Sequence, residues 1–280
     1  MEPVNRVNNN KEDSLKKRYF FKLCANLIGL PISIVIQSII PRGLGPSAYG
    51  DFTFLTNFFT KVTGFFDAGT SIAFYTKVSQ RQNDKGLIKF YWHFILFISL
   101  LIFLVIPLIF LFNKQELLWP GQSKKYIWMA LVFSLLAWDS RIINKIIDAY
   151  GYTTNGEIIR VSQKILALLL IILLFINNKL NLTSFFIYSY IILIVLSLGW
   201  WFILKKNEVS LFPKIKLKII QWKGYLKEFY HYSHPLITYS FVGLLVGILD
   251  VWLLQKFAGS VQQDSSSHVA LLPLELFSPE

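Results

Sequence analysis

The chain has 280 residues, of which 54% are hydrophobic and 16% charged, and its formal net charge is +12. Soluble domains usually carry about 25% charged residues, and here the apolar residues gather in blocks of roughly 20, the length that crosses ~30 Å of hydrocarbon as a helix. This pattern excludes a soluble globular protein and predicts an all-α integral membrane protein with about seven transmembrane helices.

Residues 1–18 are polar and precede the first apolar block, so they are expected to form a cytoplasmic N-terminal segment. They are too polar and too long for an ordinary signal peptide, and the first helix is therefore expected to be retained. The apolar blocks that follow are 19–40, 52–75, 88–112, 126–148, 158–177, 183–204 and 234–256. The first six form one predicted transmembrane lobe, residues 19–204.

Lysine and arginine are concentrated before the first span, after the second and after the sixth. These three regions share one side if the spans alternate, and the positive-inside rule makes that side cytoplasmic. We therefore expect a multi-pass protein of the cytoplasmic (inner) membrane with a cytoplasmic N-terminus. Because the basic residues flank spans instead of forming a soluble face, membrane lipids and not nucleic acid are the expected partners.

Residues 205–233 form a basic connector before the seventh predicted helix, 234–258. Apolar residues recur at helical spacing among its lysines, which favours an amphipathic helix in the headgroup layer; a solvated loop is the alternative. The apolar positions are Ile215, Ile219, Trp222, Leu226 and Phe229.

A rigid, charged turn, IIPRGLGPSAYGDF at 39–52, separates the first two spans. Pro41 and Pro46 restrict the backbone, while Gly43, Gly45 and Gly50 permit positive φ. By itself this composition predicts a tight turn between helices. The string PRGLGPSAYGDF also resembles the R-x-L-G-P-x-x-Y-G-x-F signature of polysaccharide-unit flippases. These are the Wzx-type members of the polysaccharide transporter family, within the multidrug/oligosaccharidyl-lipid/polysaccharide (MOP) exporter superfamily.

Two further stretches are similar to that family: FFDAGTSIAFYTKVSQ at 65–80 and LDVWLLQKFAGSVQQ at 249–263. The resemblance, over roughly 15–263, implies one six-helix MOP-type lobe plus the first helix of a second lobe. It also implies flipping of lipid-linked (undecaprenyl-diphosphate) oligosaccharide by alternating access in O-antigen, lipopolysaccharide or capsule synthesis. A glycan polymerase and chain-length machinery are the further partners that it implies.

The short tail, 259–280, does not continue the resemblance. Residues 264–280 are expected to be non-native, from a frameshift or truncation, because VALLPLELF is too short to span and contains Pro273 and Glu275. One lobe cannot enclose a site between two lobes. Transport would then need a second copy or another chain that supplies the missing second lobe; the alternative is an inactive product.

Three basic side chains fall inside predicted spans, where charge is costly without a partner or a wet cavity. Lys61 lies on a polar face of the second span, and Arg141 and Lys145 lie one turn apart on the fourth. We predict a cationic cavity that binds the substrate diphosphate, since arginine bonds phosphate bidentately. The alternative pairs Lys145 with Asp148, and Lys61 with Asp67 or Asp139.

Three carboxylates are candidates for ion coupling: Asp67 near the end of the second span, Asp139 on the fourth and Asp250 on the seventh. For Asp67 the structural alternative is a helix-end contact. Asp139 lies about 200° around its helix from Arg141 and should face elsewhere.

No catalytic or metal-binding motif is evident in the sequence, and the four histidines are scattered. We therefore expect no enzyme activity and no cofactor. The alternatives are multidrug or cation efflux within the same superfamily, and a membrane glycan polymerase or acyltransferase. Efflux of cations would favour acidic groups in the cavity, whereas the second and fourth spans are at least as basic as acidic.

Overall fold

The computed structural model describes residues 14–213 and 219–262, and within these ranges the chain forms helices and no strands. The expected all-α fold is therefore confirmed. The helices are α1 (Leu15–Leu44), α2 (Pro46–Asp67), α3 (Thr70–Gln80), α4 (Lys85–Leu111), α5 (Gln115–Leu118), α6 (Lys124–Ala149), α7 (Thr153–Ile176), α8 (Leu182–Lys206) and α9 (Ile219–Phe257). Predictions for residues 1–13, 214–218 and 263–280 lie outside the described residues.

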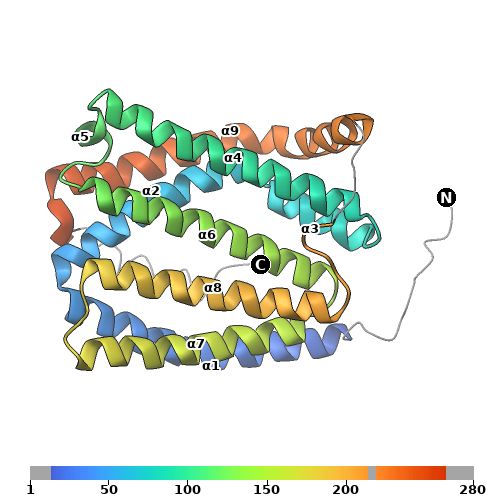
Figure 1. Ribbon diagram of the computed structural model, residues 1–280, viewed down its shortest axis with the longest axis horizontal. Coiled ribbons are helices and arrows are strands. Elements are labelled where there is room, and N and C mark those ends of the chain that lie inside the picture. The colour runs from blue at the N-terminus through green and yellow to red at the C-terminus, as the bar shows by residue number, and fades with distance from the viewer. Residues whose placement is uncertain (1–13, 214–218, 263–280) are drawn as a thin grey trace.

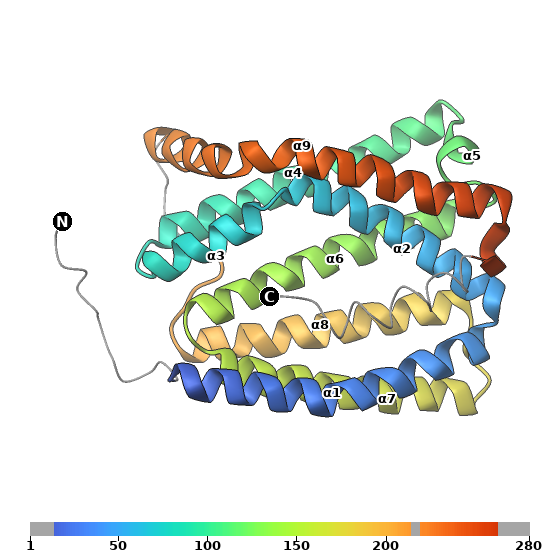
Figure 2. The same cartoon turned by 180° about the vertical axis from the view of Figure 1, so that it is seen from behind.

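The long helices run along one common direction, with α6 near the centre (Figure 1). One group, α2, α3, α4 and α9, lies on one side of α6, and α1, α7 and α8 lie on the other (Figures 1 and 2). Helix α6 contacts α2, α3, α7 and α8, so it joins the two groups. We call the end with the α3–α4 turn and Lys85 the basic end, and the end with α5 the far end.

Six described helices are long and apolar enough to cross a membrane: α1, α4, α6, α7, α8 and α9. The chain is thus a multi-pass membrane protein. The second predicted span, 52–75, is interrupted, because Ala68 (φ 37°) and Gly69 (φ 79°) are both left-handed and separate α2 from α3. Left-handed residues end an α-helix, and this local geometry is not visible in the hydrophobicity pattern.

Helix α9 is longer than the predicted seventh span. It runs for 39 residues from Ile219 to Phe257, about 58 Å at 1.5 Å per residue. The helix is continuous through 233 and 234, so the described part of the basic connector and the seventh span form one element. Pro235 lies inside it and cannot supply a backbone N–H to the helix ladder.

The predicted turn at 39–52 is much shorter than its prolines and glycines indicate. Pro41 lies inside α1 and Pro46 begins α2, where a missing N–H does no harm. Only Gly45, with φ 81°, departs from helix. The same stretch contacts residues just before α6 and just after α9: the Asp51 carboxylate accepts hydrogen bonds from Gln122 Nε2 at 2.6 Å and Ser260 Oγ at 2.5 Å.

Buried side chains form three clusters that follow this arrangement. One lies toward the basic end and includes Phe74, Tyr91 and Trp138. A second lies toward the far end around Phe59 and Trp119. The third joins α1 to α7 and α8. Because a lipid-facing helix surface is also apolar, many large hydrophobic side chains elsewhere on the bundle are exposed.

Candidate functional site

The joint between α2 and α3 is built around Asp67. Its carboxylate accepts hydrogen bonds from the Ser71 hydroxyl at 2.7 Å, the Ser71 backbone N–H at 3.2 Å and the Thr70 hydroxyl at 3.2 Å. A carboxylate next to a helix N-terminus satisfies N–H groups that lack an intrahelical partner. Asp67 therefore caps α3, and the helix-end contact considered for it is present. Its role in ion coupling stays a prediction.

Arg141 projects from α6 next to this joint. Its side chain is exposed, and its charge interacts with that of Asp67. No acidic side chain among residues 14–213 and 219–262 lies within 4.0 Å of the guanidinium nitrogens. Because Thr70 and Ser71 already donate to the Asp67 oxygens, the guanidinium retains donors for an anion.

Lys145 lies one turn from Arg141 on the same helix. Its Nζ is 5.8 Å from the centre of the Tyr75 ring of α3, a cation–π arrangement. The alternative partner of Lys145, Asp148, instead accepts a hydrogen bond from Thr153 at 2.9 Å. The structure thus brings Arg141 and Lys145 together on the face of α6 beside α2 and α3.

Lys61 occupies a different position. It is exposed on α2, and a Cβ atom at Gly247 of α9 would lie 2.9 Å from its Cε. Its charge is thus held against α9, whose Asp250 is exposed three residues further on. The meeting of Lys61 with Arg141 and Lys145 in one pocket stays a prediction, as does ion coupling by Asp250.

Asp139 faces away from Arg141, as the helical geometry predicts. It lines a separate cavity of about 520 Å³ between α4, α6 and α8, together with Trp92 and Trp201. Ser140 in the same wall shares a hydrogen bond of 2.7 Å with Ser197 of α8. The three candidate carboxylates, Asp67, Asp139 and Asp250, are thus distributed over three sites and do not form one cluster.

A buried charged group on α7 was missed in the sequence. Glu157 is 3% exposed and pairs with Arg160 at 3.0 Å, and Arg160 donates to Asn144 Oδ1 of α6 at 3.2 Å. Lys164 donates to Ser33 Oγ of α1 at 3.0 Å. The spacing of 157, 160 and 164 places all three on one helical face, which is the signal that could have identified them.

The side chains of Glu228 and Tyr225 hold the start of α9 at the basic end, and we call their contacts the latch. Glu228 of α9 pairs with Arg81 at 2.8 Å and Lys77 at 3.4 Å, and the Tyr225 hydroxyl donates to both Asp84 oxygens at 2.8 and 2.9 Å. The hydrogen bond to Glu228 raises the pKa of Arg81 above its ordinary value, so this arginine stays charged.

Within the described residues, no three His, Cys, Asp or Glu side chains gather as a metal site.

Comparison with known proteins identifies one family. A family model described as polysaccharide biosynthesis protein matches residues 15–272. The match therefore extends beyond 263, where the resemblance in the sequence was expected to end. No curated protein and no solved structure matches the chain.

Proposed function

We propose that this chain, which belongs to the polysaccharide biosynthesis protein family, takes part in flipping lipid-linked oligosaccharide repeat units across the cytoplasmic membrane, as in O-antigen or capsule synthesis. The substrate is an oligosaccharide attached through a diphosphate to a long isoprenoid such as undecaprenol. The family and the multi-pass helical bundle support membrane transport of a polysaccharide precursor rather than enzymatic chemistry on it.

The observation that carries this proposal is the exposed Arg141 guanidinium beside the α2–α3 joint, with Lys145 one turn away. Among the described residues, neither has an acidic partner within ion-pair distance. A diphosphate supplies the missing negative charge, and the planar guanidinium suits two phosphate oxygens at once. Lys61 adds a third positive charge from α2. Organic cations, the substrates of the multidrug alternative, would be repelled by this face.

Alternating access needs a second lobe opposite this basic face. We propose that the glycan polymerase and chain-length machinery then act on the exported unit. The coupling ion would be carried by a carboxylate outside the diphosphate contact; Asp67, Asp139 and Asp250 remain the candidates for it.

The test measures diphosphate binding before it measures export, because binding does not depend on a second lobe. A short-chain polyprenyl diphosphate is titrated against the purified protein in vesicles. Arg141→Ala should weaken binding at least about tenfold, equivalent to about 1.4 kcal/mol, and Arg141→Lys should weaken it less. Lys179→Ala, a change in the α7–α8 loop, is the matched control for loss of one positive charge and should bind as the wild type does.

Export is then measured in cells that lack their own flippase, with membrane insertion of each variant checked by topology labelling. Loss of surface glycan with Arg141→Ala and retention with Lys179→Ala supports the proposal. Equal diphosphate binding by wild type and Arg141→Ala removes Arg141 from the substrate site and overturns the proposed mechanism.

A further inference from the structure

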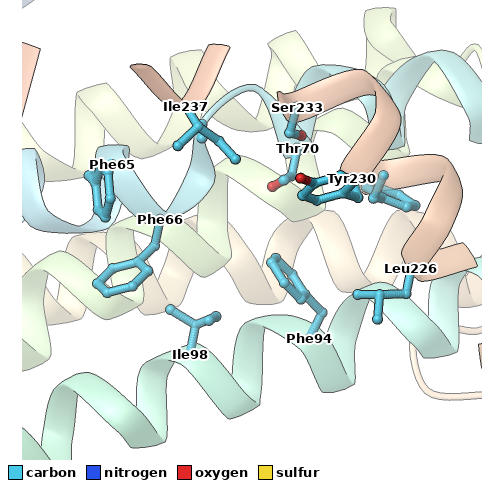
Figure 3. Close-up of a pocket in the computed structure, with 11 residues that line it drawn as sticks. Phe65, Phe66, Thr70, Phe94, Ile98, Leu226, Tyr230, Ser233 and Ile237 are labelled. Carbon is cyan, nitrogen blue, oxygen red and sulfur yellow. The ribbon is translucent and has the colours of Figure 1, made fainter. Parts of the chain in front are cut away.

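A second site lies on the opposite side of the α2–α3 joint. A cavity of about 340 Å³ opens between this joint, α4 and α9 (Figure 3), within the ~300–1,000 Å³ of small-molecule sites. Most of its wall is hydrocarbon: Phe65 and Phe66 of α2, Phe94 and Ile98 of α4, and Ile237 of α9. Arg141, Lys145 and Lys61 do not line it, so it is separate from the proposed diphosphate site.

Three hydroxyl groups lie in the otherwise apolar wall of the cavity. Figure 3 shows the hydroxyl groups of Thr70, Tyr230 and Ser233 on one side and the rings of Phe65 and Phe66 on the other. Helix α9 starts at the basic end, so Tyr230 and Ser233 lie nearer that end than Ile237 does. The apolar residues Leu226 and Phe229 of α9 lie nearer the basic end still, so the hydroxyl groups are set within an apolar wall.

Ser233 provides independent evidence for a ligand. It is 5% exposed, and its Oγ has no hydrogen-bond partner among the described residues. A serine in a helix usually bonds to a backbone carbonyl one turn earlier, to water or to another side chain. A buried hydroxyl without a partner costs free energy, so this atom in the cavity wall points to an oxygen-bearing ligand.

The backbone explains why there is space here. The left-handed residues Ala68 and Gly69 separate α3 from α2, and α9 fills only part of the resulting gap: Leu236 occupies the position that a side chain at 69 would take. At the basic end, the Phe229 ring packs against the rings of Phe90 and Tyr91 of α4 and closes the cavity. The distances between ring centres are 5.5 Å to Phe90 and 5.4 Å to Tyr91. The cavity is therefore a product of the fold and is closed at the basic end by aromatic rings.

We propose that this cavity binds one acyl chain of a membrane phospholipid, with the ester oxygens of that chain at Ser233 and its methylene units against Phe65, Phe66 and Ile98. The two helices that flank it, α4 and α9, are both candidate membrane spans, so their surroundings supply such chains. Tyr230 and Ile237 are exposed at its edge, which leaves a route of entry from the side. This inference does not depend on the proposed transport activity.

The experiment uses the full chain in phosphatidylglycerol vesicles and two photoactivatable probes, each with a diazirine near the middle of its chain. One probe is a phosphatidylglycerol with a labelled acyl chain, and the other is a labelled polyprenyl phosphate. Crosslinked residues are located by mass spectrometry. Two variants fill the cavity from different helices, Ile98→Trp and Ile237→Trp, so that misfolding of one does not decide the result. Leu100→Trp, on the exposed surface of α4, is the matched control.

We expect crosslinks to cluster on Phe65, Phe66, Phe94 and Ile98 in the wild type. Both filling variants should reduce this labelling at least about tenfold while thermal unfolding shows that they are folded, and Leu100→Trp should not reduce it. Labelling of these residues by the phosphatidylglycerol probe identifies an acyl chain and supports the proposal, whereas labelling by the polyprenyl phosphate probe alone identifies an isoprenoid chain and overturns it. Labelling spread evenly over exposed surfaces, or unchanged in both filling variants, overturns it.

Discussion

The Ser260 hydroxyl donates a 2.5 Å hydrogen bond to the Asp51 carboxylate, which joins the segment just after α9 to the start of α2 across 209 positions of the chain. Gln122 donates to the same carboxylate oxygen, and Gln255 donates to the Ser260 hydroxyl at 3.0 Å. The first turns of α2 therefore hold the segment that follows α9.

This contact predicts a specific disulfide. Cysteines at positions 51 and 260, in a Cys24→Ser background that removes the native thiol, should crosslink on mild oxidation, because their side chains meet in the structure. The measurement is a gel-mobility shift that is reversed by reductant. Cysteines at 57 and 260 are the control, since residue 57 lies about 9 Å further along α2. Equal crosslinking of both pairs would contradict the placement of α9.

Replacement of each of two glycines in α2 by alanine should change the unfolding free energy in opposite directions. A side chain at Gly50 would overlap the Ser260 carbonyl oxygen, whereas no atom lies within 4 Å of a Cβ at Gly64. Gly50→Ala should therefore destabilise by about 1–3 kcal/mol, and Gly64→Ala should stabilise by up to about 1 kcal/mol. Chemical denaturation of the reconstituted protein measures both. Equal effects would show that the segment after α9 does not approach Gly50.

Substitutions at the two left-handed residues of the α2–α3 joint should change thermal stability in opposite directions. Ala68 carries a Cβ in a conformation that costs about 1–2 kcal/mol for an L-residue, so Ala68→Gly should raise the unfolding temperature. Gly69→Ala should lower it, because the new side chain meets both the left-handed backbone and Leu236. Thermal unfolding in the same lipid compares the two variants. A loss of stability with Ala68→Gly would argue for a continuous helix through 68 and 69.

For the Glu157–Arg160 pair on α7, a single substitution should lower the unfolding free energy more than a double substitution does. Glu157→Gln leaves the partly buried Arg160 guanidinium without its anion but with its hydrogen bond to Asn144, and should cost about 1–3 kcal/mol. Glu157→Gln combined with Arg160→Met removes both charges and should recover much of that loss. A double-mutant cycle on unfolding free energies measures the coupling. Additive single effects would show that the two side chains do not interact.

The strength of the latch at the basic end should decrease as the salt concentration rises. Arg81 is half-exposed, and such pairs contribute about 0.2–1 kcal/mol. Glu228→Gln should therefore leave global stability almost unchanged while it increases the mobility of a spin label at position 227. Exchange of the charges, Glu228→Arg with Arg81→Glu, should restore the wild-type spectrum at low salt and not at high salt. No change in mobility with Glu228→Gln would show that Tyr225 alone holds α9.

The amino-acid sequence by itself determined the membrane class, the approximate span positions and the polysaccharide family resemblance. Hydrocarbon length and apolar composition constrain every span locally, so the blocks correspond closely to α1, α4, α6, α7 and α8. The separate faces of Arg141 and Asp139 also followed from helical periodicity alone.

Only the tertiary structure decided how the polar groups are partnered. The left-handed joint at Ala68 and Gly69, the burial of Glu157 among three helices and the Asp51–Ser260 contact all depend on which helices become neighbours. Those neighbours are far apart in sequence, and apolar periodicity marks a lipid-facing surface and a packed surface in the same way. Hydrogen-bond partners and cavities are properties of helix pairs, which no single span encodes.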